Sequence, residues 1–378
     1  MAESAGVAPT WRSSFPAMGT RVDIIGWGGD GMAIVNAVVE VVARHEDMWS
    51  VFRPSSEVSR LNDAVASTGG GGGASRCGAD SAQAGPGLVV SEETDRLLRD
   101  ALALAEATGG AFNPLIGPLV AAWDVKAMRA AYVAGAPLPP APAADVVEAA
   151  VRASSWGLLS RVGERRWAMG VPGESVGGVD APSPSLDLGG IAKGYTADAC
   201  RDLAVAMGVR GVLVSVGTSS VSVFGTRADG SSWRAGLRDP QGGPTSVAGV
   251  VELPVDGMSS LSTSGDNLGP LGVLAPEVVG RAAGSVSGRP VRETSRETPG
   301  GGGRVFDHHI IDPRTGYPAH AGVRQVNVVA SSGVLAEALS TALLVDPSID
   351  VPDVVARWVR VTGAQASAKV VGLVRAGR

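Results

Sequence analysis

The chain has 378 residues, of which 44% are hydrophobic and 18% charged, a balance typical of a globular protein with one large domain or two smaller ones. The net charge of -5, without any basic run, argues against nucleic-acid binding, and no apolar stretch of about 18 residues predicts stable membrane insertion. The two cysteines, Cys77 and Cys200, form no Cys-x-x-Cys pair, which argues against a disulfide framework or a zinc site.

The N-terminal residues 1–14 lack a basic start followed by an apolar stretch, so we expect no signal peptide and a cytoplasmic location. Glycine is abundant, at 53 residues, and runs such as Gly69–Gly73 are typical of flexible loops. Lysine occurs only at positions 126, 193 and 369, which draws attention to Lys193 in the glycine-rich segment described below.

In the first half of the chain we expect, in order, a strand over 15–26, a helix over 31–48, a serine-rich segment over 53–62, an exposed insertion over 63–87 and a helix over 92–108. The first helix is indicated by apolar residues at helical spacing, from Met32 through Val38 to Val42. Ser91 is a plausible N-cap for the second helix, and Gly109 follows its end.

In the second half we expect a Pro-Ala linker over 134–144 and a helix over 145–153, followed by a strand end, glycine turn and helix over 186–206. Two strands are expected over 211–225, and one each over 233–238, 246–253 and 324–330. A long loop is expected over 268–304, and a last helix over 333–345. Helices and strands are mixed without a regular βαβ rhythm. This order predicts an α+β fold, not a doubly wound parallel sheet.

The segment Leu186-Asp187-Leu188-Gly189-Gly190-Ile191-Ala192-Lys193-Gly194-Tyr195 contains the first group of candidate site residues. Paired glycines allow backbone to approach a ligand closely, and the N-terminus of the following helix suits a phosphate. Lys193 adds a cation there, although the spacing is not that of a Walker loop. On spacing alone, a tight turn with an exposed lysine explains the segment equally well.

Glu337 and Thr341 form a second candidate pair, because residues four apart share one face of a helix. A carboxylate and a hydroxyl together offer oxygen ligands to Mg²⁺. The alternative, favoured by the two residues alone, is an exposed Glu337 and a Thr341 hydroxyl bonded back to its own helix.

The third segment, 308–316, contains His309 before an Asp-Pro-Arg-Thr-Gly turn. His309 is a candidate general base or ligand contact, and a structural histidine that caps the turn is the alternative. Three further segments, 15–20, 109–119 and 262–266, each read alone as a turn beside hydrophobic residues.

Taken together and in this order, these segments resemble the ApbE family, the FAD:protein FMN transferases, from about Phe15 to about Val345. The most specific matches are LDLGGIAKGYTAD at 186–198 and HIIDPRTG at 309–316, supported by FPAMGT, SSEVSRLN, STSGD and ALSTAL. The resemblance implies an α+β, T-fold-related flavin transferase fold with FAD in a cleft between lobes. It further implies a tail over 1–13, a transferase domain over 14–350 with insertions at 63–87 and 268–304, and a C-terminal extension over 351–378.

The resemblance also implies the residues of the site. The Mg²⁺ ligands would be the Gly190 carbonyl, Glu337 and Thr341. The FAD contacts would be Met18, Phe52, Ala111, Phe112, Asn113, Asp187, Lys193, His309 and Ile310. A threonine or serine hydroxyl of an acceptor protein, in a motif of the Asp-Gly-x-Thr type, would attack the FMN phosphorus and release AMP. A base must take the hydroxyl proton, and His309 and Asp266 are our own candidates for it.

The sequence departs from the family pattern at several of these positions. Glu337 and Asn113 stand where the family usually has aspartate, Asn267 replaces an aromatic residue, and Thr218 replaces a glycine. The substitutions at 113, 267 and 337 keep open a non-catalytic FAD-binding protein. An FAD pyrophosphatase that gives FMN and AMP also stays open, because it would use the same residues as the transferase. A protein that has kept only the fold is a further alternative.

Overall fold

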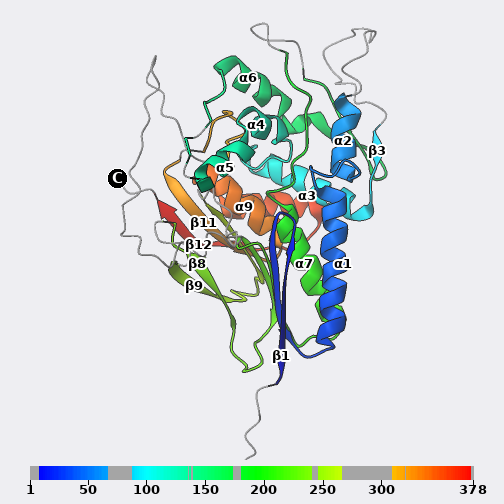
Figure 1. Cartoon of the computed structure of the whole chain (residues 1–378), viewed down its shortest axis with the longest axis vertical. Coiled ribbons are helices and arrows are strands. Elements are labelled where there is room, and N and C mark those ends of the chain that lie inside the picture. The colour runs from blue at the N-terminus through cyan, green and yellow to red at the C-terminus, as the bar shows by residue number, and fades with distance from the viewer. Residues whose placement is uncertain are drawn as a thin grey trace, which may run out of the picture.

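The computed structural model describes residues 8–66, 87–134, 136–137, 139–172, 180–240, 246–265, 309–319 and 321–375. Within these ranges, seven strands form an antiparallel sheet in the order β1-β2-β6-β7-β10-β11-β12 (Figure 1). The strands are β1 (Thr10–Ala17), β2 (Thr20–Trp27), β6 (Gly211–Val216), β7 (Ser220–Gly225), β10 (Ser260–Gly265), β11 (Val323–Ala330) and β12 (Ala368–Arg375).

Three helices cover one face of this sheet: α1 (Gly31–Trp49), α7 (Ala192–Ala206) and α9 (Gly333–Val345). Of the apolar positions predicted for α1, Val38 and Val42 are buried and pack with Ile34 and with Val22 and Ile24 of β2. Met32, in the first turn of the helix, is exposed. Helix α7 packs between α1 and α9, which places the glycine turn before α7 next to the middle of the sheet.

The opposite face is covered by the hairpin β8 (Trp233–Arg238) and β9 (Val247–Leu253). Because side chains alternate along a strand, Val223 and Leu261 pack with this hairpin, while the neighbouring Ser222 and Ser260 face the helices. The helix-facing surface of β7 and β10 therefore carries buried hydroxyl groups, which can solvate charged groups in the helix layer.

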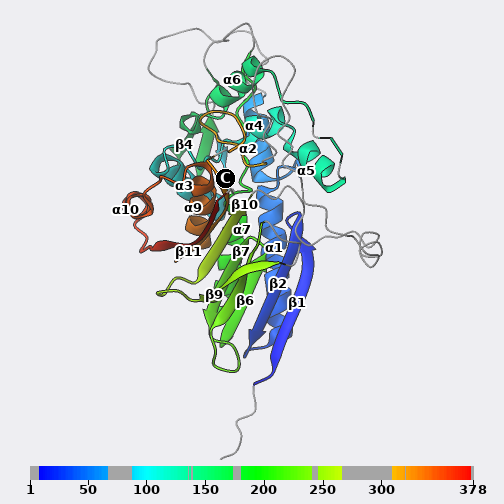
Figure 2. The ribbon, with the colours of Figure 1, turned by 90° about the vertical axis from the view of Figure 1, so that its left-hand side faces the viewer.

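A mainly helical cap lies above the end of α1 (Figures 1 and 2). It comprises α2 (Glu57–Ala66), β3 (Leu88–Val89), α3 (Glu92–Ala107), α4 (Gly117–Ala122), α5 (Val125–Ala134), α6 (Ala144–Ala153), a 3₁₀ turn at Trp156–Leu158, β4 (Leu159–Gly163) and β5 (Arg166–Met169). Helix α10 (Val351–Thr362) packs against α3, and β12 then pairs with β11. The residues expected as a C-terminal extension thus add an edge strand to the main sheet. Within the described ranges, no helix is long and apolar enough to cross a membrane.

The α+β class is confirmed, as are the helix over 333–345 and the Ser91 cap, whose hydroxyl accepts a hydrogen bond from the Thr94 amide at 3.2 Å. The single strand predicted over 15–26 is wrong. Met18 and Gly19 adopt left-handed φ values of 52° and 67°, which turn the chain and divide the segment into the β1–β2 hairpin.

One further expectation is corrected by the structure: the segment 262–266, predicted as a turn, continues strand β10 through Gly265. The serine-rich segment 53–62, for which no element was predicted, enters helix α2 at Glu57. Both segments contain many serines, and tertiary packing overrides their weak local preferences. The predicted loop over 268–304 and most of the insertion over 63–87 lie outside the described residues.

Candidate active site

The glycine turn before α7 is held in place by side-chain hydrogen bonds. Asn62 pairs with the backbone of Leu186 in both directions, donating to its carbonyl at 3.1 Å and accepting from its amide at 2.7 Å. Asp187 accepts from the Gly189 amide at 2.8 Å. Helix α7 begins after Ile191 without a side-chain cap from that residue, although the Ala192 amide donates to the Leu188 carbonyl at 2.9 Å. The helix dipole still gives this end a partial positive charge, which favours an anion.

Helices α7 and α9 meet at two glycines, Gly194 and Gly333. A Cβ atom on either residue would overlap the backbone of the other. Only glycine permits this close approach, and it brings the N-terminal turns of the two helices into direct backbone contact.

Glu337, the acid of the predicted metal site, lies at this crossing and is buried, with 4% of its side chain exposed. One carboxylate oxygen accepts from the Gly194 amide at 2.8 Å and the other from the Ser220 hydroxyl at 2.5 Å. The Lys193 ammonium lies 3.4 Å from the second oxygen and also donates to the Gly189 carbonyl. The interpretation of Glu337 as an exposed residue is therefore wrong.

Thr341 lies one helical turn after Glu337, as predicted. Its hydroxyl is 3.2 Å from that of Ser264 on β10, and Ser264 also contacts Ser340 at 2.8 Å. A Cβ atom built on Gly190 would be 4.0 Å from Thr341 Oγ1, so the glycine turn and α9 converge. The structure thus places Gly190 close to Thr341, with Glu337 one turn earlier on the same helix.

The chemistry of this donor set fits a hard divalent cation, because carboxylate, hydroxyl and carbonyl oxygens are the ligands that Mg²⁺ prefers. Across the part of the chain that the structure describes, no three His, Cys, Asp or Glu side chains gather as a metal cluster. A cation here would therefore have one carboxylate and mixed neutral oxygens as ligands, which leaves room for oxygens of an anionic substrate.

Asp198 forms a second buried polar cluster one turn further along α7. One of its oxygens accepts from the Gly333 amide at 2.6 Å, and the other accepts from Ser222 at 2.8 Å, Ser260 at 2.7 Å and Arg201 at 3.0 Å. Burial lowers the pKa of Arg201, but the carboxylates of Asp198 and Asp202 outweigh this effect and hold that pKa above its ordinary value. Sequence reasoning included Asp198 in a motif but gave it no role.

The predicted FAD contacts are distributed over several segments. Phe112 lies beside the glycine turn, since a Cβ on Gly190 would be 3.6 Å from its ring, and the adjacent Ala111 is buried. Met18 lies in the β1–β2 turn, and Phe52 lies after α1, is 81% exposed and has the Lys126 ammonium 5.9 Å from its ring centroid.

Asn113 uses both ends of its amide within the protein. Its nitrogen donates to the Ser154 carbonyl at 2.5 Å, and its oxygen accepts from the Leu115 amide at 2.9 Å. A carboxylate at this position would face the Ser154 carbonyl without a proton to donate. The departure from aspartate therefore suits the local fold.

The predicted bases lie at the edge of what the structure describes. His309 begins the segment 309–319, and the carbonyl of the half-buried Ile310 accepts from the Ala319 amide at 2.8 Å. Asp266 lies outside the described residues, as does Asn267.

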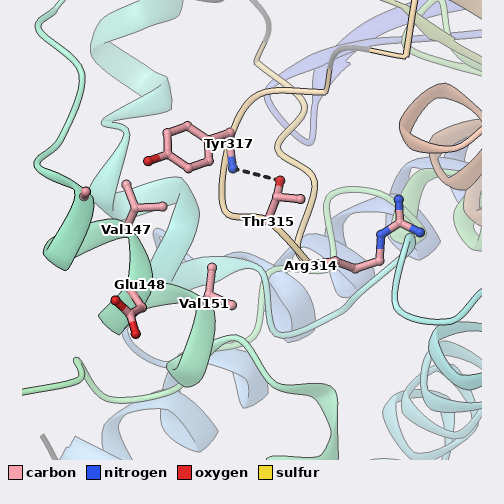
Figure 3. Close-up of a pocket in the computed structure, with 7 residues that line it drawn as sticks. Val147, Glu148, Val151, Arg314, Thr315 and Tyr317 are labelled. Atoms are coloured by element: carbon pink, nitrogen blue, oxygen red, sulfur yellow. Dashed lines mark hydrogen bonds between the residues drawn. The ribbon is translucent and has the colours of Figure 1, made fainter. Parts of the chain in front are cut away.

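A separate groove of about 360 Å³ lies between α6 and the turn at 312–317 (Figure 3). It is lined by Ala144, Val147, Glu148, Val151, Arg314, Thr315 and Tyr317. The Arg314 guanidinium is held by Asp312 at 3.0 Å and Asp346 at 3.0 Å, so the charge of this groove is largely neutralised. The groove contains none of the predicted metal or FAD contacts.

Comparison with known proteins identifies the family of the chain. The profile of the ApbE family matches residues 18–269 and 283–362. A FAD:protein FMN transferase of Treponema pallidum is 32% identical over 278 residues, which cover 70% of this chain but only 63% of the relative. One of Vibrio cholerae is 25% identical, covering 88% of this chain and 80% of the relative.

Solved structures show the same fold. The ApbE protein of Thermotoga maritima is similar to this chain with a TM-score of 0.64 and 25% identity, covering 97% of both chains. The flavin transferase ApbE of Vibrio cholerae has a TM-score of 0.62 and 22% identity, covering 96% of this chain and 93% of the other.

Proposed function

The chain belongs to the ApbE family, and on this basis we propose that it transfers the FMN part of FAD to a threonine or serine hydroxyl of an acceptor protein and releases AMP, with Mg²⁺ required for turnover. The observation that carries the proposal is the convergence of the glycine turn, Lys193, Glu337 and Thr341 at the α7–α9 crossing. This crossing combines a helix N-terminus and a lysine, which suit a diphosphate, with oxygen ligands that suit its divalent counter-ion.

Gly190, Glu337 and Thr341 would hold the Mg²⁺ ion. When bound, the cation neutralises charge on the diphosphate as its bond breaks. Glu337 suits this role because its buried carboxylate already requires a compensating positive charge. Without bound metal, that charge comes from Lys193.

The remaining residues of the site would bind and orient the substrate. Lys193 and the positive N-terminal end of the α7 dipole would attract the diphosphate of FAD, and the buried Phe112 next to Gly190 would bound the site on one side. The acceptor oxygen forms a bond to the FMN phosphorus, the bond from that phosphorus to the AMP oxygen breaks, and the hydroxyl proton passes to a base. His309 and Asp266 are our candidates for this base.

Incubation of the protein with FAD, Mg²⁺ and an acceptor that carries an Asp-Gly-x-Thr motif tests the proposal. We expect a covalent FMN adduct on the acceptor, seen by intact-mass spectrometry and in-gel flavin fluorescence, together with an equal amount of AMP. The same acceptor with the motif threonine changed to valine should remain unmodified. Free FMN and AMP without an adduct would identify a pyrophosphatase, and intact bound FAD would identify a flavin-binding protein; either result contradicts the proposal.

A further inference from the structure

The two helices at the candidate site hold each other by reciprocal hydrogen bonds. The Gly194 amide of α7 donates to Glu337 of α9 at 2.8 Å, and the Gly333 amide of α9 donates to Asp198 of α7 at 2.6 Å. In each helix the carboxylate follows its glycine by four residues. The glycine–carboxylate clasp, formed by Gly194, Asp198, Gly333 and Glu337, is therefore arranged in the same way from both sides.

The surroundings of the two carboxylates are also matched. Strand β7 supplies a hydroxyl to each, from Ser220 to Glu337 and from Ser222 to Asp198. A cation accompanies each as well: Lys193 lies 3.4 Å from Glu337, and Arg201 lies 3.0 Å from Asp198. One half of the clasp is part of the candidate metal site, while the other half lies one helical turn away from it.

We propose that Asp198 is a positioning residue for the divalent cation, and this inference rests on the proposed function of the same site. Asp198 fixes Gly333, the first residue of α9. Glu337 and Thr341 follow on the same helix, so a shift of its first turn moves both proposed ligands together. Mg²⁺ tolerates little departure from its preferred geometry, and a residue that never touches the ion thus controls its affinity.

The two oxygens of Asp198 accept hydrogen bonds from different groups, so a substitution can test the positioning role of this residue. One oxygen accepts from Gly333, and the other accepts from Ser222, Ser260 and Arg201. An asparagine has only one acceptor oxygen, so Asp198→Asn must place an N–H group either against the Gly333 amide or against the Arg201 guanidinium. The clasp loses a contact in both orientations, while the volume of the side chain is unchanged.

The experiment is a titration of the metal-free full-length protein with Mn²⁺ as the probe, with free Mn²⁺ followed by electron paramagnetic resonance. We expect Asp198→Asn to weaken Mn²⁺ binding by about tenfold, the lower end of the range for residues behind a metal ligand. FAD affinity, measured by flavin fluorescence in EDTA, should stay within about twofold of wild type, because the residues that contact the substrate are retained. Asp202→Asn is the matched control, since Asp202 also bonds Arg201, at 2.8 Å, but is exposed and lies outside the clasp.

Unchanged Mn²⁺ affinity in Asp198→Asn overturns the inference, as does an equal loss of Mn²⁺ and FAD affinity, which would indicate general unfolding. Absence of Mn²⁺ binding to the wild-type protein overturns it too. Should Asp198→Asn not fold, Asp198→Glu keeps the charge but displaces Gly333, and wild-type Mn²⁺ affinity in that variant contradicts the role. The titration needs no acceptor protein and no turnover, so failure of the transferase assay leaves its result intact.

Discussion

Asp198 and Glu337 occupy corresponding places in the glycine–carboxylate clasp, yet their surroundings differ in one respect. The cation beside Asp198 is Arg201, whose guanidinium is 13% exposed and also bonds Asp202, Ser222 and Ser259. The cation beside Glu337 is Lys193, which is 25% exposed and shares its ammonium with a backbone carbonyl. Arginine forms a rigid, multiply bonded fork, whereas lysine is a flexible point charge.

This difference separates a structural carboxylate from a functional one. The partners of Asp198 are all fixed within the protein, so its charge is permanently compensated. Glu337 has a partner that can leave, and its neighbours Thr341 and Gly190 offer oxygens to a cation that replaces the lysine. The same backbone arrangement thus supports one position that holds the helices together and another that is free to exchange its counter-ion.

The largest expected effect comes from the same chemical change made on both sides of the clasp. Glu337→Gln should reduce Mg²⁺-dependent FMN transfer by about 10³-fold, because it removes the only charged ligand of the proposed cation. Asp198→Asn should cost only about tenfold, through ligand position. Initial rates of AMP release at saturating FAD over a range of Mg²⁺ concentrations measure both, and equal losses would remove the distinction between the two carboxylates.

The glycine crossing itself is the next test. Gly333→Ala places a methyl group against the Gly194 carbonyl, so the helices must separate and the clasp must stretch. We expect a loss of about 3 kcal/mol in the free energy of unfolding, at the upper end for overpacking against backbone. Urea unfolding followed by circular dichroism measures this loss.

Gly157→Ala is the control for that measurement, because its added methyl group would lie 3.8 Å from the nearest atom, the Ser155 hydroxyl. Its free energy of unfolding should stay within about 1 kcal/mol of wild type, since only backbone freedom changes. A Gly333→Ala protein as stable as this control would mean that the helices can separate without cost.

The sequence predicted one half of the clasp and missed the other for a physical reason. On local signals alone, the turn at 189–190 with Lys193 and the pair Glu337 and Thr341 were open to a purely structural interpretation, and the resemblance of several ordered segments to a known family made them predicted site residues. The role of Asp198 depends on a contact between residues 135 positions apart, which needs the order of the helices in space. The shared spacing of glycine and acid, Gly194 with Asp198 and Gly333 with Glu337, was the only available signal.

The same limit applies to the fold. Helices α1, α3 and α9 were predicted because apolar periodicity and caps are local, whereas β10 was taken for a turn since its serines favour strand only when they face a polar helix layer. Whether Asn113 and Glu337 leave the site fully active is likewise set by neighbours such as Ser154 and Gly194, which no pattern in the sequence identifies.

Lys193, the exchangeable counter-ion of Glu337, can be removed by mutation. Without FAD, Lys193→Met should strengthen Mn²⁺ binding by about tenfold, because the metal no longer competes with the ammonium for Glu337. FAD affinity should fall, since the diphosphate loses a cation. Calorimetric titration with Mn²⁺ and flavin fluorescence measure the two effects.

A second lysine, Lys369, makes this test specific. Lys369→Met removes an exposed lysine whose ion pair with Asp256 is 3.5 Å long, and it should change neither affinity. A fall in Mn²⁺ affinity in Lys193→Met, instead of a rise, would show that the lysine supports the metal and does not compete with it.

The smallest expected effect concerns Asp100 of α3, a buried carboxylate outside the clasp. Burial raises its pKa from 3.8 to about 6, in spite of the nearby Arg96 and Arg99. The folded protein therefore binds a proton that the unfolded chain has released, and this contribution to stability disappears as the pH rises from about 4 to about 6.

Asp100→Asn lacks this loss and should be more stable than wild type near neutral pH, by on the order of 1 kcal/mol. Urea unfolding at about pH 4 and about pH 7.5 tests the sign: the advantage of the variant must be larger at the higher pH. A constant difference would mean that the neighbours of Asp100 compensate its charge, as those of Asp198 do.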